Sequence, residues 1–440
     1  MRTTDYNGGI ALDEMEKEEG ETYSVEDLRR LAGINLRTIK DSPEYPNLLV
    51  FPGKWNAYHD RVVSSVIFTL SDKNELKTRN IMGFIGVGNT NLAITSRFAE
   101  KDKSDNFLYY MLYKVMKINI FNLKHPEGKN GIWDFLLFLF PIFLNKALSQ
   151  GLYKEYKYNE YNDANVRGVI DVKRHIRLNI PFSGKVAYST REYSYDNPVT
   201  QIIRHTIEYI KAHEWGGNLL TADSVTHMNT GQIMFSTPTY NRNSRQKIIG
   251  INRMKTVVHP YFREYRELQN LCIRILCNEK LSYRNEKEKV HGILFNGSWL
   301  WEEYLNMLLK RNFEYQRGCR LFENSNETIR PDFIGKRKPR IICDAKYKPL
   351  DELLGRTDRK RNLADYYQLI TYMYRLKSKK GFLLFPYSDE KWKNPEIKKL
   401  KLGGEINLLG LKIPNHTDFR EFLKAMEESE KKLIDEIEKQ

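Results

Sequence analysis

Apolar residues in the first part of the chain fall into short runs separated by charged or glycine-containing turns. The runs are aliphatic or β-branched and occupy residues 62–70, 81–87 and 92–95. Such alternation is typical of antiparallel strands joined by tight turns. The cluster of Gly83, Gly86 and Gly88 lies between two of these runs and fits a hairpin turn better than a nucleotide site. We therefore expect a β-rich domain over residues 1–125.

Helical spacing replaces this alternation from about Asn106 onward. Apolar residues recur every three or four positions in three further segments, at 132–148, 202–213 and 261–277. A polar stretch over residues 215–245, rich in Gly, Ser, Thr and Asn, interrupts the pattern and predicts a boundary or an excursion. The middle region, residues 126–290, is accordingly predicted to be mostly helical.

The last region, residues 291–440, alternates between the two patterns. Ser298 is a suitable cap for a helix that runs to about Lys310. The elements expected after it are two strands joined by a basic turn, a helix, a buried strand and a charged amphipathic helix, at residues 329–334, 340–345, 362–376, 381–385 and 417–440. This order predicts an α/β domain, so we expect a multidomain protein of the α+β or α/β class.

Composition indicates a basic, folded protein. The 440 residues carry 71 Lys and Arg against 56 Asp and Glu, and the formal net charge of +15 favours an anionic partner such as nucleic acid. With 41% hydrophobic residues, the chain has enough apolar mass for packed cores. The most apolar stretch, residues 132–144, is about half as long as a bilayer span, so we expect a core helix and no membrane partner.

Cysteine spacing and the N-terminus bear on the compartment. The four cysteines, at 272, 277, 319 and 343, lack the spacing of a zinc site and fit buried thiols in a reducing environment. The first 20 residues are acidic where a secretory signal would need a positive start and an apolar run. We therefore expect a cytoplasmic protein.

The segment RPDFIGKRKPRIICDAKYK, residues 330–348, holds the most informative polar residues. Asp332 lies near the end of the first strand-like run, Asp344 ends the second, and Lys346 follows two residues later. Alternation along a strand places Asp344 and Lys346 on the same face. A tight turn between the strands brings Asp332 toward that face. Glu302, in the first turn of the preceding predicted helix, is available as a third carboxylate.

Carboxylates that face one another repel unless a cation lies between them, and hard oxygen ligands select Mg²⁺ or Mn²⁺. Such a metal can acidify bound water, and a neighbouring lysine can orient that water or stabilise charge on a phosphate. The pattern predicts Glu302, Asp332 and Asp344 as metal ligands and Lys346 as a catalytic residue in phosphodiester hydrolysis. The alternative is that both aspartates are turn or strand-end residues and the lysine is solvated, because such short patterns recur by chance.

The next predicted helix places Asp365, Gln368 and Tyr372 on one face. Gln368 and Tyr372 are predicted to support the site by holding the DNA backbone or the catalytic lysine, although both are ordinary residues on an amphipathic helix. Basic residues near the segment are either DNA phosphate contacts or solvated surface. These candidates are Lys336, Arg337, Lys338, Arg356, Arg359, Lys360 and Arg361.

Nucleotide chemistry is not expected from this chain itself. Gly-Lys occurs four times, and each time Trp, Asn, Val or Arg follows where a phosphate-binding loop needs Ser or Thr. The nine histidines show no His-Glu-x-x-His motif, so a histidine-bound metal is not expected either.

These residues carry a family resemblance. The pattern of Asp332, Asp344 and Lys346 with Gln368 and Tyr372 resembles the PD-(D/E)xK nucleases of the RecB-like branch. The wider chain resembles the McrC family, the nuclease subunits of McrBC-type restriction systems directed at modified (5-methylcytosine) DNA. Segments that resemble that family in the same order are LAITSRF (92–98), GLYKEYKYNEYNDANVRGVIDVKRHIRLN (151–179), YDNPVTQIIRHTI (195–207) and LWEEYL (300–305). The first 45 residues and the C-terminal helix are not covered, and Trp301 stands where the family usually has Phe.

The resemblance implies a Mg²⁺-dependent endonuclease subunit with a PD-(D/E)xK core in residues 291–440. Glu302, Asp332 and Asp344 match the family's carboxylates, and Lys346 matches its catalytic lysine. It also implies an McrB-like AAA+ GTPase ring as partner, which the N-terminal region, residues 1–125, would dock with and stimulate. Two alternatives stay open: a non-catalytic adaptor that binds DNA or activates the GTPase, and a standalone RecB-like repair nuclease.

Overall fold

The chain forms two compact units in a computed structural model. One unit combines residues 1–121 with residues 286–440, and the other comprises residues 122–285. The structure describes residues 1–16, 23–36, 45, 47–52, 66–88, 90–99, 105–116, 131–213, 216–221, 223–281, 290–323, 326–355, 359–389, 392–401, 403–416 and 419–439.

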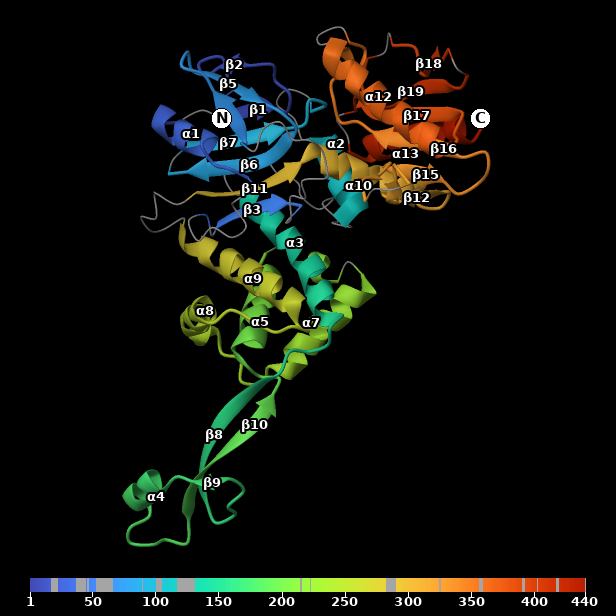
Figure 1. The fold of residues 1–440 in the computed structure, drawn as a ribbon. Coiled ribbons are helices and arrows are strands. Elements are labelled where there is room, and N and C mark those ends of the chain that lie inside the picture. Colours follow the sequence, from blue (N-terminus) through green and yellow to red (C-terminus); the bar gives the residue numbers. More distant parts are fainter. Residues whose placement is uncertain are drawn as a thin grey trace. The chain divides into compact units, whose positions relative to one another are not determined.

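A five-stranded sheet organises the first part of the larger unit (Figure 1). Its strand order is β1 (Arg2–Thr4), β7 (Thr90–Thr95), β6 (Ile81–Val87), β11 (His291–Asn296) and β3 (Asn47–Phe51). Around it lie α1 (Val25–Ala32) and a small sheet of β2 (Ile10–Ala11), β5 (Glu75–Thr78) and β4 (Phe68–Leu70). The expected hairpin forms, with Val87 of β6 opposite Thr90 of β7, but Gly83 and Gly86 lie inside β6 and not in the turn, where Gly88 lies. Strand β11 joins this sheet from far along the chain, so residues 291–296 are structurally part of it.

A six-stranded sheet forms the second half of the same unit. Its order is β12 (Phe313–Tyr315), β15 (Phe333–Gly335), β16 (Ile341–Ala345), β17 (Lys380–Tyr387), β19 (Glu405–Lys412) and β18 (Glu396–Lys399). Strands β16, β17 and β19 run parallel, and nearly every residue of β17 and β19 is buried. Such continuous burial means that both faces of the sheet are covered. The remaining elements of this half are α10 (Gly297–Leu309), β13 (Cys319–Arg320), β14 (Thr328–Ile329), α11 (Leu350–Leu353), α12 (Arg359–Arg375) and α13 (Phe419–Glu438).

Two local expectations for this half were wrong. The helix α10 is capped by Asn296, whose side chain accepts from the backbone amides of Ser298 and Trp299, and Ser298 already lies inside the helix. The strand expected over residues 329–334 is split into β14 and β15, and Asp332 lies between the two. The other elements predicted around the acidic residues form as expected, at β16, α12 and β17.

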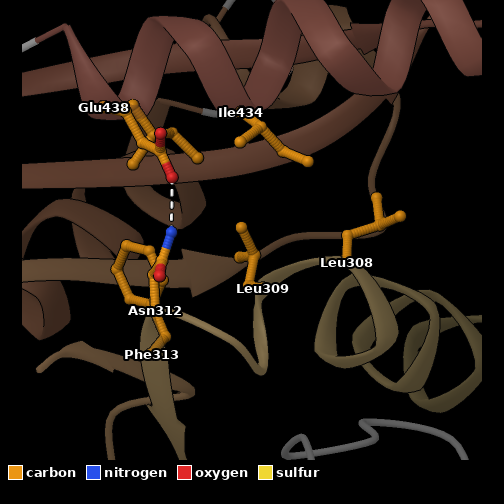
Figure 2. Close-up of a pocket in the computed structure, with 7 residues that line it drawn as sticks. Leu308, Leu309, Asn312, Phe313, Ile434 and Glu438 are labelled. Atoms are coloured by element: carbon orange, nitrogen blue, oxygen red, sulfur yellow. Dashed lines mark hydrogen bonds between the residues drawn. The ribbon is translucent and has the colours of Figure 1, made fainter.

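A buried polar cluster ties the C-terminal helix α13 to the rest of the unit. Glu430 accepts hydrogen bonds from Tyr304 of α10 (2.6 Å) and from Tyr110 of α2 (Asn106–Met116; 2.7 Å). Its other oxygen lies 3.2 Å from Lys114 Nζ. Figure 2 shows a small pocket farther along α13, where Asn312 donates to Glu438; none of the predicted site residues lines it.

The smaller unit is built mainly from helices. They are α3 (Gly131–Leu148), α5 (Pro198–Lys211), α6 (Gly216–Leu220), α7 (Ser224–Ser236), the short 3₁₀ helix η2 (Arg242–Ser244), α8 (Arg245–Met254) and α9 (Arg263–Leu281). The polar stretch over residues 215–245 therefore contains helices in place of the expected interruption. Among the described residues, no helix has the length and apolarity that crossing a membrane requires.

A long hairpin projects from this helical part (Figure 1). Strands β8 (Glu155–Asp163) and β10 (Val186–Ser194) pair antiparallel along all nine residues, and β9 (Val169–Ile170) with α4 (Val172–Leu178) lies at the far end. We refer to residues 155–194 as the hairpin arm. Sequence patterns did not predict it, because its strands carry polar and aromatic residues on both faces.

Candidate active site

The two predicted aspartates lie side by side at the carboxyl end of β16. Strands β15 and β16 pair with Phe333 opposite Cys343, so Asp332 and Asp344 occupy the next pair of positions. Asp332 Oδ2 accepts a hydrogen bond from the backbone amide of Ala345 at 2.7 Å. Asp344 is almost fully buried, at 1% exposure. The carboxyl ends of parallel strands are where α/β folds place their ligand sites, and these aspartates lie at that edge.

Lys346 contacts Asp344 directly. Its Nζ lies 2.6 Å from Asp344 Oδ2, and its side chain is 9% exposed. The backbone amide of Lys346 donates to the carbonyl of Leu384 in β17 at 2.8 Å, which fixes the chain beyond the end of β16. Lys346 and Asp344 therefore form a buried ion pair at the end of β16.

Helix α12 supplies a second set of contacts to this lysine. Lys346 Nζ donates to Gln368 Oε1 at 3.0 Å, and Gln368 Nε2 donates to Tyr372 Oη at 2.7 Å. Asp365 contacts two lysines: its Oδ1 lies 3.7 Å from Lys346 Nζ, and Asp365 Oδ2 lies 2.8 Å from Lys348 Nζ. Lys346 is therefore held between β16 and α12.

Glu302 approaches the aspartates from α10. Its Oε1 accepts from Gln316 Nε2 at 2.5 Å, and its charge is felt at Asp332. The neighbouring Glu303 instead accepts from Tyr315 Oη at 2.9 Å. The helix thus directs these adjacent glutamates to different partners.

The electrostatics of the site follow from crowding of like charges in a buried place. Burial first, and then the charges of Asp344 and Glu302, raise the pKa of Asp332 well above its usual range. Burial and the charge of Asp344 also raise the pKa of Tyr372 to about 12, so its hydroxyl keeps its proton. The carboxylates form a site that a cation would stabilise.

The predicted DNA-binding residues fall into two groups. Lys336, Arg337 and Lys338 are exposed in the turn between β15 and β16, roughly 13 Å along the strands from the aspartates, so the structure does not bring them to the site. Lys336 Nζ instead donates to the carbonyls that end α10, at 2.9 and 3.1 Å. Arg356 lies outside the described residues, and only the backbone is described for Arg359, Lys360 and Arg361 at the start of α12.

Comparison with protein families decides the relationship. The McrBC 5-methylcytosine restriction system component family matches residues 76–386, which include all six predicted catalytic residues. The chain belongs to this family. A comparison with curated proteins gave no significant match.

A solved structure shares the fold of this chain. The chain is similar to a protein chain in a solved structure from Thermococcus gammatolerans. That structure is a refined half-complex from a tetradecameric assembly of McrB AAA+ hexamers with bound McrC. That likeness covers 97% of this chain and 99% of the other at 14% identity, with a TM-score of 0.53. The cryo-EM structure of the Thermococcus gammatolerans McrBC complex gives 16% identity over 71% of this chain and 87% of the other, with a TM-score of 0.36.

Three contacts at the site were not assigned from the sequence. Asp365 was placed on the same helix face as Gln368, but the i, i+3 spacing gave no reason to pair it with Lys346 and Lys348. Gln316 reaches Glu302 from the segment after β12, and nothing in the local pattern marks it. In the McrBC fold, such contacts arise from the packing of α10 and α12 around β16.

Proposed function

We propose that the chain is the Mg²⁺-dependent DNA endonuclease subunit of an McrBC-like restriction system, with a PD-(D/E)xK core. The observation that carries this proposal is the buried lysine that contacts Asp344 at 2.6 Å while Asp332 and Glu302 face the same place. Family membership supports it, because the family is a component of 5-methylcytosine restriction. A binding module alone has no need for apposed buried acids next to a lysine.

The donor set fits a hard divalent cation. Within the described ranges, no three His, Cys, Asp or Glu side chains are close enough to enclose an ion by themselves. Mg²⁺ does not need such a cage, because it keeps several waters and uses one or two carboxylates together with substrate phosphate. Asp332 and Asp344 would hold the ion, with Glu302 as the third carboxylate. When bound, the metal would supply a water of lowered pKa and a positive charge beside the phosphate.

The chain's own residues then have separable roles. Lys346 presents a fixed positive charge where negative charge develops on the phosphate, or orients the attacking water. Gln368 and Asp365 hold the lysine amine in place, and Tyr372 holds Gln368. The basic residues around the start of α12, from Arg356 to Arg361, remain our proposed DNA contacts because that helix carries Gln368.

The hairpin arm is our proposed contact with the AAA+ partner. Its tip exposes large apolar side chains, including Val169 at 77% and Phe182 at 69% exposure. Such a patch on a soluble surface marks a protein interface. By contrast, the described part of residues 1–125 exposes no large apolar side chain of this kind. We therefore place partner docking on the arm as well as, or in place of, the N-terminal region.

The tip is built to present those side chains. A Cβ at Gly168 would lie 2.1 Å from the carbonyl oxygen of Ser189, so only glycine fits where the chain crosses β10. Asp171 caps α4, and Arg174 Nη2 donates to the carbonyls of Tyr161 and Tyr188 at 2.7 Å each. Asp171 and Arg174 thus hold the tip to the arm, while Val169 and Ile170 stay largely exposed.

The test is DNA cleavage by the chain assembled with its GTPase partner, measured while Mg²⁺ is titrated. Asp344→Asn and Glu302→Gln should each lower the cleavage rate by about 100-fold or more, because each removes a carboxylate from the ion. The matched controls are Asp351→Asn, at an exposed position of α11, and Glu303→Gln, which alters only the contact with Tyr315. Both controls should cleave like the wild type.

The competing functions predict different results in the same assay. A non-catalytic adaptor would support GTP hydrolysis by the partner but never cleave DNA at any Mg²⁺ concentration. A standalone repair nuclease would cleave without partner or GTP. Full Mg²⁺-dependent cleavage by the Asp344→Asn variant would remove the basis of the proposed active site.

A further inference from the structure

The LAITSRF segment, residues 92–98, lies outside the proposed active site, yet its arginine reaches the chain next to Lys346. Arg97 follows β7 in the five-stranded sheet. Its Nη1 donates to Asp5 Oδ2 at 2.8 Å, and its backbone amide donates to the other oxygen of the same carboxylate. The Asp5 side chain is fully buried. This pairing fixes the orientation of the guanidinium group.

The same guanidinium holds the two residues that follow Lys346. Arg97 Nη2 donates to the backbone carbonyl of Lys348 at 3.1 Å. Its Cζ lies 4.4 Å from the centre of the Tyr347 ring, within the range of a cation–π contact. A planar group with several donors can bind a carboxylate, a carbonyl and an aromatic face together, whereas a lysine ammonium cannot.

The Tyr347 ring also seats the start of α10. A Cβ at Gly297 would lie 2.7 Å from the ring, so the first residue of α10 packs directly against it. The backbone amide of Gly297 donates to the carbonyl of Asn80 in the β5–β6 turn at 2.6 Å. Glu302 lies five residues farther along α10. Tyr347 therefore lies between Arg97 and the helix that carries the third carboxylate.

We propose that Arg97 is a positioning residue for the nuclease reaction, and this inference rests on the proposed function. Arg97 with Asp5, the Tyr347 ring and the Lys348 carbonyl forms what we term the Arg97 clamp. The clamp fixes Lys346 relative to Glu302 by anchoring residues 347–348, and through Tyr347 the start of α10, to the chain that follows β7. It gives Arg97 a role at an active site that it does not touch.

The first test compares Arg97→Ala and Arg97→Lys with Arg30→Ala, an exposed arginine on α1, in the complete complex with Mg²⁺. Displacement of a catalytic group by about 1 Å costs up to 100-fold in rate, so kcat for cleavage should fall by about tenfold or more in both Arg97 variants. The KM for DNA and the GTP hydrolysis of the partner should stay at wild-type values. Added N-ethylguanidinium should restore part of kcat to Arg97→Ala only.

A kcat for Arg97→Ala close to that of the wild type would overturn the proposal. So would a parallel fall in kcat, GTP hydrolysis and folded protein, because that result indicates a structural role alone. The same reactions test the proposed function separately. If the wild type cleaves DNA and Asp344→Asn does not, the proposed function holds whatever the result for Arg97.

A second readout does not depend on activity. In the metal-free full chain, Arg97→Ala should speed hydrogen exchange at the amides of Lys346, Tyr347 and Lys348 by about tenfold or more, because the clamp holds that segment closed. Arg30→Ala should leave those amides unchanged. Unchanged exchange in Arg97→Ala would overturn the clamp whether or not the complex cleaves DNA.

Discussion

Ionisable side chains are buried in both units, and burial sets the direction of each pKa shift while nearby charges add to it or oppose it. Burial, followed by the charges of two nearby carboxylates, raises the pKa of Asp332. Burial raises the pKa of Asp5 to about 6 even though the charge of Arg97 opposes the shift. The pKa of His205 in α5 shifts in the opposite direction. Burial, followed by the charges of Arg245 and Arg204, lowers it to about 4. The pKa shifts of Asp332, Asp5 and His205 therefore affect the stability of the fold at different pH values as well as the chemistry of the site.

The His205 shift predicts how the helical unit responds to acid. The unfolded chain takes up the proton near pH 6.5 and the folded chain only near pH 4, so stability present above pH 6.5 is lost as the pH falls through that window. The loss is on the order of 2 kcal/mol. His205→Gln should flatten this part of the stability profile, as followed by hydrogen exchange of the α5 amides.

The control for this prediction is His227→Gln, at an exposed position of α7. It should retain the wild-type pH dependence. If His205→Gln and the wild type lose stability equally between pH 6.5 and 4, burial of a neutral histidine is not the cause.

At the scale of elements, the hairpin arm makes the clearest prediction. Replacing Val169 and Ile170 at its tip with serine removes mainly exposed apolar surface, since the two residues are 77% and 49% exposed. Association with the GTPase partner should weaken by about tenfold or more, measured by sedimentation or calorimetry, with the chain's own stability unchanged.

The matched control alters the arm away from the tip. Tyr158 lies at an exposed position of β8. The Tyr158→Ser variant should weaken binding to the partner much less than the tip variant does. Equal affinity of the tip variant and the wild type would place the docking surface elsewhere, with residues 1–125 as the first candidate.

Elements with a local signal were predictable from the sequence, and those that depend on distant pairing were not. β16 and β17 show regular apolar spacing because they lie in one covered sheet, and α12 does because it packs against that sheet. The arm lacks that signal because most residues of its strands are exposed or half-buried. Strand β11 has an apolar pattern, but its pairing with β6 and β3 joins residues more than 200 positions apart.

The same distinction applies to the site. Asp332, Asp344 and Lys346 lie close together in sequence, so strand alternation predicted Asp344 and Lys346 on one face and the tight turn between the strands predicted Asp332 near them. Helix spacing also predicted Gln368 near the lysine, and in the structure Gln368 Oε1 accepts from Lys346 Nζ at 3.0 Å. Arg97 is about 250 residues from Tyr347 and Lys348, and no local rule connects them. Only the folded unit brings Arg97 into contact with these two residues.

At the scale of the whole molecule, the chain carries both the proposed active site and the proposed docking surface. The net charge of +15 suits a DNA partner, while the acids at the end of β16 lie in a buried centre. The larger unit contains both the five-stranded sheet and the proposed nuclease core, linked by β11 and by the Arg97 clamp. The smaller unit carries the hairpin arm. Membership of the McrBC family is consistent with this division between cleavage and partner binding.

The central claim is that Lys346 and its acidic partners hydrolyse DNA while other parts of the chain serve the GTPase. The direct test is to measure DNA cleavage and GTP hydrolysis in one reaction with the Lys346→Met complex. We predict a loss of cleavage by about 100-fold or more with unchanged GTP hydrolysis, since the variant removes the positive charge that contacts Asp344 and Gln368 at the proposed site. Mg²⁺-dependent cleavage at the wild-type rate in that complex would contradict the account.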